Sequence, residues 1–351
     1  IVTPAQAEQV LKSGAADLVG MTRALIADPD LPTKARNQQP EQIRVCMGSN
    51  EGCIDRLYFG LPIGCVQNPV VGREQSWGNL TPATKPRHIV VIGGGPAGME
   101  TARVAASRQH QVTLLERDNK LGGAIQIVAR ASGWESYLQC VTWLKNQLQD
   151  LEIDIRLETD ATTNLICSLS PDAVVVATGA EPRRPNLAGA NLPHVVTVSD
   201  ILSGSANPSG RCVILDETGY TPGATTADTL SQLGYDVEIV TRQYALGEDI
   251  GTTVRAVLHE RLLRTGVRIT TLHTPVEITT SGVRLMHVLT DEERFIEADT
   301  VVLSSSGIGR DALHRELGEG NNYELHLIGD AFAPRHLRHA MVDGARTGRA
   351  L

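Results

Sequence analysis

The sequence lacks the features by which several large classes of protein are recognised. None of its apolar runs approaches the roughly 20 residues that a membrane-spanning helix needs. Its first residues, IVTPAQAEQVLKSG, contain neither the basic nor the apolar segment of an export signal. The formal net charge is −8, which argues against nucleic acid as the main partner because phosphate binding needs a basic surface. We therefore expect a cytoplasmic protein that binds neither membranes nor nucleic acids.

Cysteine is also scarce, and its placement is uneven. Only six cysteines occur in 351 residues, and three of them crowd into one short segment. Cys140, Cys167 and Cys212 are scattered in apolar surroundings, and we expect them to be buried core thiols. This usage fits a reducing compartment better than a disulfide framework. The sequence shows no nucleophile–base pair and no histidine-rich metal site, so it identifies no catalytic residue.

The crowded segment has the spacing C-x2-S-x3-C-x11-C, formed by Cys46, Ser49, Cys53 and Cys65. Thiolates at short fixed intervals suit an iron–sulfur cluster, since thiolate is the soft ligand that iron in a sulfide cage prefers. Four ligands are usual for a [4Fe–4S] cluster, and here Ser49 offers a hydroxyl in place of one thiol. The motif predicts a cluster whose fourth position is bound by Ser49, bound by another group or left without a ligand.

A second motif follows in RHIVVIGGGPAGMETARVAA, residues 87–106. It has the pattern of a strand, a turn and a helix, in which Gly93, Gly95 and Gly98 give G-x-G-x-x-G. The first glycine permits a tight turn, the second lets the backbone approach a pyrophosphate, and the third packs the helix on the strand. Glu116 ends the next strand, where a carboxylate would bind ribose hydroxyls. The complete set predicts a site for an adenine dinucleotide.

A second strand–helix unit repeats this plan without the glycines. After its first strand, RCVILD, the three glycine positions are taken by Asp216, Thr218 and Thr221. Their Cβ atoms would block close approach of the backbone, and Asp216 and Glu217 would repel a pyrophosphate. We expect this unit to keep the fold without binding NAD(P)H.

Other residues of the same unit leave alternatives open. Gly219 and Gly223 could build a different turn. Arg242, at the end of the next strand, is either a contact for a 2′-phosphate or a solvated side chain.

The order of the segments gives an α/β fold class. Residues 1–40 contain a helix, a strand and a helix that cannot bury their own faces, so we interpret them as the end of a (β/α)8 barrel in a longer protein. The cysteine segment and a linker rich in proline and glycine occupy residues 41–86. Residues 87–192 with 318–351 are predicted to form one doubly wound nucleotide-binding domain, and residues 193–317 a second.

These motifs, in this order, resemble the iron–sulfur flavoprotein branch of the old yellow enzyme family, which includes amine dehydrogenases, demethylases and 2,4-dienoyl-CoA reductase. The matching segments are GMTRALIADPDLPTKA, IRVCMGSNEGC, CVQNPVVGRE, VVIGGGPAGMETARVAA, LERDNKLGG, VVVATGAEPR and LIGDAFAPR. Such enzymes carry FMN in an N-terminal barrel, a [4Fe–4S] cluster just after it, and then a pair of domains like that of glutathione reductase.

The resemblance also implies which residues hold FMN and the cluster. Arg23 and the backbone near Thr22 would hold the FMN phosphate, and Arg23 follows a barrel-type strand, DLVGMT, as a phosphate contact would. Cys46, Cys53 and Cys65 would ligate the cluster. Ser49 stands where the family has its second cysteine.

The resemblance further implies the contacts of FAD or ADP. The motifs ATG and GDA each follow an apolar strand, and each alone is only a turn from a strand into a loop. The implied contacts with FAD or ADP are Gly93, Gly95, Pro96, Ala97, Gly98, Glu116, Arg117, Gly122, Gly123, Thr178, Gly179, Gly329 and Asp330.

Three hypotheses for function follow. The first is an amine or N-methyl dehydrogenase, which passes electrons from FMN through the cluster to an electron-transfer flavoprotein. The second is an NAD(P)H-dependent enoate reductase, which needs a working nicotinamide site. The third is a non-catalytic nucleotide-binding docking module that has lost the cluster. We expect a small-molecule substrate and a homo-oligomer.

Overall fold

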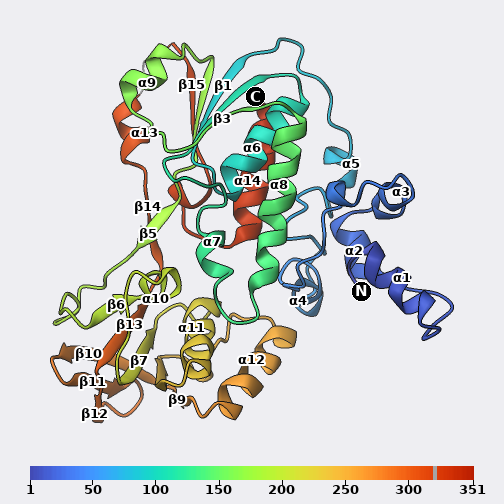
Figure 1. Cartoon of the computed structure of the whole chain (residues 1–351). Helices are drawn as coiled ribbons and strands as arrows, with labels where there is room; N and C mark the ends of the chain where they lie inside the picture. The colour runs from blue at the N-terminus through green and yellow to red at the C-terminus, as the bar shows by residue number, and fades with distance from the viewer. Residues whose placement is uncertain (319–321) are drawn as a thin grey trace. The chain divides into compact units, whose positions relative to one another are not determined.

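A computed structural model of the chain describes residues 1–318 and 322–351 (Figure 1). The chain divides into two units, each described here by itself. Unit 1 consists of Ile1–Gln126, Ser136–Ala180 and Gly309–Leu351, and unit 2 of Ile127–Glu135 and Glu181–Ile308. Among the described residues, no helix has both the length and the apolar character to cross a membrane.

The first part of unit 1 consists of short helices and loops. They are α1 (Pro4–Lys12), α2 (Thr22–Ala27), α3 (Leu31–Arg36), the 3-10 turn η1 (Pro40–Gln42), α4 (Ile54–Tyr58) and α5 (Glu74–Trp77). The strand predicted for DLVGMT is wrong, since residues 17–21 form no strand and Leu18 is exposed. A parallel strand needs a neighbour to pair its backbone N–H and C=O groups, and no described strand lies next to this segment. The barrel end of the predicted fold class is therefore not seen in this chain.

Unit 1 is built on a five-stranded parallel sheet with the order β15-β4-β1-β2-β3. The strands are β1 (His88–Ile92), β2 (Gln111–Leu115), β3 (Asp154–Arg156), β4 (Ala173–Val176) and β15 (Glu324–Leu327). The helices around it are α6 (Pro96–Ser107), α8 (Leu138–Asp150), α9 (Thr163–Ser168), α13 (Ala312–Leu317) and α14 (Leu337–Ala350), with the 3-10 turn η3 (Gly329–Ala331). Short helical turns α7 (Ile125–Val128) and η2 (Glu135–Tyr137) lie between α6 and α8 in the chain.

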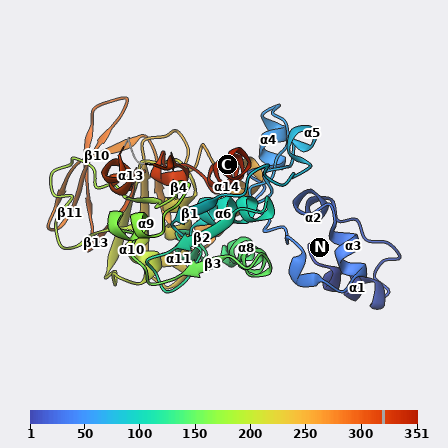
Figure 2. The same ribbon diagram turned by 90° about the horizontal axis from the view of Figure 1, so that it is seen from above.

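Helices cover both faces of this sheet, which explains why its central strands β1, β2 and β4 are mostly apolar and buried. α6, α8 and α14 lie on one side, and α9 and α13 on the other (Figures 1 and 2). On the second side, a cluster of buried apolar side chains joins the sheet to α9 and α13: Val90, Ile92, Val174, Val176, Ile166 and Leu317.

Unit 2 has its own five-stranded parallel sheet, in the order β6-β13-β7-β8-β9. Its strands are β6 (Val195–Thr197), β7 (Arg211–Asp216), β8 (Asp236–Thr241), β9 (Arg268–Thr270) and β13 (Thr300–Ser304). A three-stranded antiparallel sheet follows β9 in the chain, formed by β10 (His273–Thr279), β11 (Gly282–His287) and β12 (Glu293–Glu297). The helices are α10 (Val198–Ser203), α11 (Thr221–Gln232) and α12 (Thr252–Arg264), and β5 (Ala180–Pro182) pairs with β14 (Gly307–Gly309).

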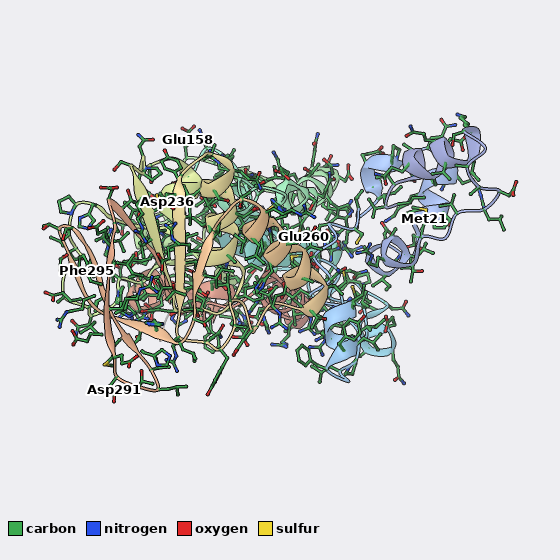
Figure 3. The ribbon with its side chains drawn as sticks, turned by 90° about the horizontal axis from the view of Figure 1, so that it is seen from below. Met21, Glu158, Asp236, Glu260, Asp291 and Phe295 are labelled. Atoms are coloured by element: carbon green, nitrogen blue, oxygen red, sulfur yellow. The ribbon has the colours of Figure 1, made fainter. Side chains whose placement is uncertain are left out.

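The parallel sheet of unit 2 lies between helices and the antiparallel sheet. Alternate residues of β7 divide between the two layers, because successive strand side chains point to opposite faces. Ile214 packs with α11 and α12, whereas Val213 packs with Leu285 and Ile296 of the antiparallel sheet. That sheet was not predicted, and Phe295 lies exposed on its outer side (Figure 3).

Two of the three scattered cysteines are buried as expected, and the third is not. Cys140 and Cys212 are buried, as predicted. Cys167 is exposed, and the prediction that it is a core thiol is wrong. Its neighbour Ile166 takes the inward position of α9, which turns Cys167 toward solvent.

Replacing Gly98 by alanine should destabilise unit 1. An added Cβ would lie 1.9 Å from the carbonyl oxygen of Gly93 and would push α6 away from β1. We expect the free energy of unfolding to fall by about 1–3 kcal/mol. Urea unfolding followed by circular dichroism measures this change.

Gly95→Ala is the matched control. No heavy atom lies within 4 Å of its added Cβ, and its φ of −76° suits alanine. In nucleotide-free protein, the unfolding free energy should therefore change by less than about 0.5 kcal/mol. An equal fall in the free energy of unfolding of Gly98→Ala and Gly95→Ala would contradict the packing role assigned to Gly98.

Glu238 makes the stability of unit 2 depend on pH. Its fully buried carboxylate accepts hydrogen bonds from Thr270, Arg211, Arg268 and Arg294 at 2.7, 2.7, 3.4 and 3.3 Å. Burial acts to raise the pKa of Glu238, but these donors outweigh it and hold the pKa below its usual value. A lowered folded-state pKa stabilises the fold above the unfolded-state pKa of about 4.3, and that stabilisation is lost as pH falls through the folded value.

Glu238→Gln should therefore lower the melting temperature at neutral pH and flatten its decline below about pH 5. The measurement is thermal unfolding at a series of pH values. The control is Glu260→Gln, because the Glu260 carboxylate is exposed and pairs with Arg264 on the same helix. If the melting temperature of Glu238→Gln falls below about pH 5 as steeply as that of the wild type, Glu238 is not the source of the acid sensitivity.

Candidate cofactor and metal sites

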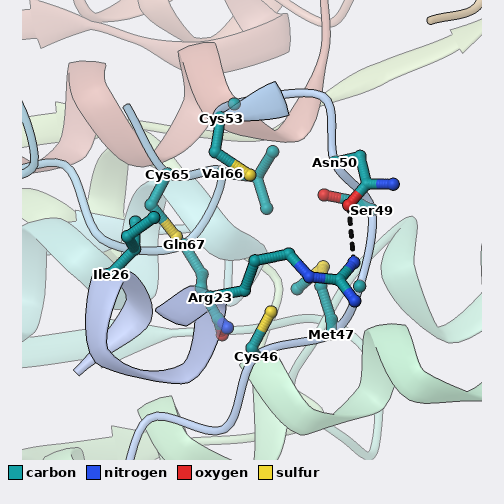
Figure 4. A pocket seen from close by; sticks show the side chains of 12 residues that line it. Arg23, Ile26, Cys46, Met47, Ser49, Asn50, Cys53, Cys65, Val66 and Gln67 are labelled. Carbon is teal, nitrogen blue, oxygen red and sulfur yellow. Dashed lines mark hydrogen bonds between the residues drawn. The ribbon is translucent and has the colours of Figure 1, made fainter. Parts of the chain in front are cut away.

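The four residues of the cysteine–serine motif line one pocket of unit 1 (Figure 4). Cys46 and Ser49 lie in the loop after η1, Cys53 directly precedes α4, and Cys65 lies in the loop after it. Across residues 1–318 and 322–351, no three His, Cys, Asp or Glu side chains stand close enough to hold a metal ion. The structure brings the motif together, and its role as a ligand set stays a prediction.

Backbone contacts hold the two cysteine-bearing loops together. The N–H of Gly64 donates to the carbonyl of Gly52 at 2.7 Å. A Cβ on Gly52 would lie 2.8 Å from the nitrogen of Val66, so only glycine allows this approach. The Ser136 hydroxyl also donates to the carbonyl of Met47 at 2.9 Å. The positions of the thiols are thus set by the fold of the loops.

Hydrogen-bond donors and a positive charge surround Cys65. Burial raises the pKa of its thiol, whereas the N–H groups of Gln67 and Asn68 and the charge of Arg44 favour the thiolate. Burial likewise raises the pKa of Cys53. The sulfur of Cys65 therefore has the N–H donors that stabilise an iron-bound thiolate.

Arg44 provides a test of whether the pocket suits a cluster. This residue is only 9% exposed, its Nε atom has no hydrogen-bond partner, and its guanidinium forms no ion pair in the described part of the chain. A buried charge without a partner is costly, so an anionic group is expected nearby. A cluster bound by thiolates carries net negative charge, and the residues present fit it.

Ser49 is hydrogen-bonded to the hydroxyl of Tyr137. Burial, together with the charge of Glu51, raises the pKa of Tyr137, so this phenol stays protonated. A serine hydroxyl that takes part in one hydrogen bond keeps at least one lone pair on its oxygen. The contact is therefore compatible with Ser49 as an iron ligand, but does not require it.

Arg23 points into the same pocket. Its guanidinium donates to the side-chain oxygen of Asn50 at 2.7 Å, the dashed line in Figure 4. Thr22 is the first residue of α2. The structure thus places Arg23 beside the cysteines, while the expected contact of Arg23 and Thr22 with an FMN phosphate stays a prediction.

The glycine turn between β1 and α6 has the geometry that its sequence predicts. Gly93 has φ +106°, and an added Cβ would lie 2.4 Å from the carbonyl of Ala177. Gly98 contacts Gly93 closely, whereas the space around Gly95 is open. No side chain caps the first N–H groups of α6. Free N–H groups and the positive end of a helix suit a phosphate.

Glu116 is tied to this turn in a way that sequence reasoning missed. One of its oxygens accepts the N–H of Gly94 at 2.6 Å, and the other accepts the N–H of Asp118 at 2.8 Å. The carboxylate therefore stabilises the turn, and its contact with ribose stays a prediction. Arg117 is more than half exposed beside it.

Gly122 and Gly123 lie against the same turn. The N–H of Gly122 donates to the carbonyl of Gly94 at 2.8 Å. A Cβ on Gly123 would lie 3.1 Å from the Cα of Gly95. Both have positive φ, at +121° and +51°, which glycine adopts readily.

Thr178 and Gly179 follow β4 and lie beneath the turn. The Cα of Thr178 is 3.3 Å from where a Cβ on Gly93 would stand. The Thr178 hydroxyl donates to the carbonyl of Arg310 at 2.5 Å, and Gly179 has φ +73°.

Gly329 and Asp330 reach the turn from the last strand of the sheet. A Cβ on Gly329 would lie 2.8 Å from the Cβ of Ala97, which follows Pro96 at the start of α6. Burial raises the pKa of Asp330, whose carboxylate accepts the N–H of Arg335 at 3.0 Å. The predicted nucleotide contacts thus gather around the N-terminus of α6.

In the corresponding turn of unit 2, between β7 and α11, the side chain of Gln243 lies against the backbone of the turn. Asp216 is 3% exposed, and one of its oxygens accepts hydrogen bonds from Thr218 and Ser304. Gly219 has φ +63°, and an added Cβ would lie 2.0 Å from Nε2 of Gln243. Gln243 therefore fills the space next to the turn, in contrast to the open space around Gly95.

Gly223 takes the helix-packing position in this turn. An added Cβ would lie 2.9 Å from the hydroxyl of Ser304 and 3.1 Å from Asp216. Thr221 is simply the first residue of α11. The structure has the alternative turn, in which Gly219 and Gly223 are the close-contact glycines.

A hollow of about 400 Å³ lies beside this second turn. Asp216, Glu217 and Arg242 are among its lining residues. Glu217 pairs with Arg183 at 2.5 Å, and burial raises the pKa of Asp216. Acidic and basic groups share the lining, so charge gives it no preference for a pyrophosphate.

Sequence reasoning missed Arg44, Trp143 and Gln243. Arg44 stands two residues before Cys46, which was the one available signal. The Arg44 guanidinium lies 3.8 Å from the ring centre of Trp143, a contact between distant segments that no local pattern marks.

Comparisons with known proteins identify relatives of this chain. A family model described as pyridine nucleotide-disulphide oxidoreductase matches residues 73–164 and 154–326. N,N-dimethylglycine/sarcosine dehydrogenase of Chromohalobacter salexigens is 38% identical over 311 residues, which cover 86% of this chain and 45% of that protein. The multifunctional alkene reductase/demethylase OYE of Caballeronia cordobensis is 28% identical over 380 residues, covering 99% and 55%.

A solved structure, that of a 2-naphthoyl-CoA reductase, is 30% identical with a TM-score of 0.94, covering 99% of this chain and 53% of that one. The chain spans about half the length of the curated relatives it matches. The chain belongs to the pyridine nucleotide-disulphide oxidoreductase family, and the findings confirm its resemblance to the flavin-dependent dehydrogenases, demethylases and reductases related to old yellow enzyme.

Proposed function

We propose that this chain is the electron-transfer part of a flavin- and iron–sulfur-dependent oxidoreductase, best matched by an amine or N-methyl dehydrogenase. The observation that carries this choice is the difference between the two turns. Open space surrounds Gly95 in unit 1, whereas Gln243 lies against Gly219 in unit 2. A bound dinucleotide fits the first turn, and NAD(P)H is disfavoured at the second. Electrons would then come from an organic substrate.

In unit 1 the residues around α6 would bind and orient FAD or ADP. The uncapped N–H groups of α6 would meet its pyrophosphate, with the backbone at Gly95 close to it. Glu116 and Asp330 would accept hydrogen bonds from its hydroxyls.

The cysteine pocket would hold the second redox group. Cys46, Cys53 and Cys65 would be the thiolate ligands, and Ser49, which lines the same pocket, would offer an oxygen for the fourth position. Bound there, an iron–sulfur cluster supplies one-electron transfer. The N–H groups that point at Cys65 would hold its sulfur in the charged form.

Several parts of the whole protein's activity are proposed on the relatives alone. FMN, with Arg23 near its phosphate, would receive the electrons of a small-molecule substrate. An electron-transfer flavoprotein would collect them. A homo-oligomeric assembly and a cytoplasmic location complete the proposal. The similarity to a dimethylglycine/sarcosine dehydrogenase supports an amine as substrate.

A reductase fed by NAD(P)H is the second candidate. Arg242 lines the hollow of unit 2 and has no ion pair or hydrogen bond in the described residues. An arginine at the end of this strand is where a 2′-phosphate contact is found in NADP sites. The similarity to a 2-naphthoyl-CoA reductase also favours it. A non-catalytic docking module is disfavoured, because the reported relatives are named as enzymes.

The flavin of this protein should not be bleached rapidly by NADH or NADPH under anaerobic conditions. Gln243 fills the space against Gly219, and the carboxylates of Asp216 and Glu217 stand where a pyrophosphate would need hydrogen-bond donors. Stopped-flow absorbance measures the rate of bleaching. Dithionite, which needs no binding site, should reduce the same flavin.

Acid extraction and chromatography first determine whether the preparation holds FAD or ADP. If it holds ADP, the protein is loaded with FAD before the stopped-flow measurement. Rapid bleaching at micromolar NADPH would establish the reductase instead. Arg242→Ala should then raise the Km for NADPH more than that for NADH.

Ser49→Cys should convert an incompletely ligated cluster into an ordinary [4Fe–4S] cluster. A serine hydroxyl has a much higher pKa than a thiol and is a harder ligand, so it binds iron less well. We expect the wild-type protein to show a [3Fe–4S] signal or an unusual [4Fe–4S] signal in electron paramagnetic resonance. Iron and labile-sulfide analysis should rise to four of each in the variant.

The control is Cys167→Ser, because Cys167 is an exposed thiol on α9 outside the pocket. Its iron content and spectrum should equal those of the wild type. If neither wild type nor Ser49→Cys takes up iron during anaerobic reconstitution, the cluster is rejected.

A further inference from the structure

Arg44 is a buried cation of unit 1 that has no counter-charge of its own. It is 9% exposed, and its buried Nε atom lacks a hydrogen-bond partner. Its backbone N–H, rather than its guanidinium, donates to Asp28 at 2.8 Å. Burial lowers its pKa, as expected for a charge taken out of water.

The nearest carboxylates are already paired with other cations. Asp28 accepts a hydrogen bond from the ammonium of Lys34 at 2.6 Å. Glu100, which is fully buried, accepts two hydrogen bonds from the guanidinium of Arg103 at 2.7 and 2.8 Å. These pairs leave little negative charge for Arg44.

Trp143 fixes the position of the guanidinium without neutralising it. The Arg44 guanidinium carbon lies 3.8 Å from the centre of the Trp143 ring. The indole N–H donates to the carbonyl of Gln42 at 3.0 Å, which ties α8 to the segment that carries Arg44. A cation–π contact stabilises a charge, but less than full burial of that charge costs. A further, anionic neighbour is therefore expected.

The cysteine pocket is where an anionic group could be bound near Arg44. Cys46 follows Arg44 by two residues in the chain, and the positive charge of Arg44 acts on the thiol of Cys65. We propose that Arg44 is the internal counter-ion of an iron–sulfur cluster held by Cys46, Cys53 and Cys65, and that it raises the reduction potential of that cluster. This inference rests on one part of the proposed function, the presence of the cluster.

The direction of the effect follows from charge. Reduction adds one electron to the cluster, breaks no bond and makes the site more negative by one charge. A fixed buried cation stabilises the reduced state more than the oxidised state, and low polarity around it strengthens the attraction. An oxygen ligand from Ser49 would favour the oxidised state, so Arg44 would offset the loss of the fourth thiolate.

The test is a potentiometric titration of the anaerobically reconstituted full chain, monitored by electron paramagnetic resonance. The proteins compared are the wild type, Arg44→Met, Arg44→Lys and Arg36→Met. Arg36 is the matched control, because it is an exposed arginine of the same N-terminal part. Loss of a solvated charge should hardly change the potential.

Arg44→Met should lower the midpoint potential by at least about 59 mV, which is a tenfold fall in the ratio of reduced to oxidised cluster for a one-electron couple. Arg44→Lys, which keeps the charge, should stay close to the wild type, as should Arg36→Met. Unchanged potential in Arg44→Met with full iron content would overturn the inference while leaving the proposed function intact.

Two other outcomes also decide the matter. A wild-type protein that takes up no iron or sulfide removes the cluster, and with it this inference. Arg44→Gln serves as a second neutral variant in case Arg44→Met does not fold. If both neutral variants unfold without iron while Arg44→Lys folds, the charge serves the protein fold itself, and the inference is overturned.

Discussion

The close approach of α6 to β1 and α14 is the constraint on which unit 1 depends. An added Cβ on Gly98 would stand 1.9 Å from the carbonyl of Gly93, and one on Gly344 of α14 would stand 2.4 Å from the carbonyl of Ala97. Because two glycines remove the side chains from these contacts, the start of α6 lies directly over the carboxyl ends of the strands. The turn that this approach creates leaves the first N–H groups of α6 uncapped. The same packing that stabilises the helix therefore also makes it a site for an anion.

The two units share one plan and differ in what lies next to the turn. In unit 1, Gly122 and Gly123 pack on the turn and bring no side chain near Gly95. In unit 2, the side chain of Gln243 lies against Gly219, and Asp216 replaces the first glycine. Nothing in the parallel sheet needs to change for this difference, because the sheet is stabilised by its own apolar layers. A nucleotide site can thus be lost by changing a turn while the fold is kept.

The sequence predicted best what local patterns determine. The apolar runs HIVVI and RCVILD form parallel strands as expected, and the spacing of the glycines predicted the turn of unit 1. The strand expected at residues 17–21 failed because a parallel strand exists only beside a partner, which the sequence of the strand itself does not reveal. The contact between Arg44 and Trp143 joins α8 to a loop far away in the chain, so only the folded structure shows it. The exposure of Cys167 could not be predicted from its own apolar surroundings either, because it is the neighbouring Ile166 that faces the core.

Buried charged side chains among the described residues are stabilised in different ways. Glu100 and Glu238 are each paired with arginine side chains. Asp216 lacks a cation, and burial raises its pKa, so protonation offers it a neutral state. An arginine cannot become neutral in this way at any ordinary pH, because its guanidinium loses its proton only in strong base. A buried arginine stacked on a tryptophan therefore has to be balanced by a neighbouring negative charge. At Arg44, the group that can supply this charge is the set of thiolates at Cys46, Cys53 and Cys65, once iron has displaced their protons.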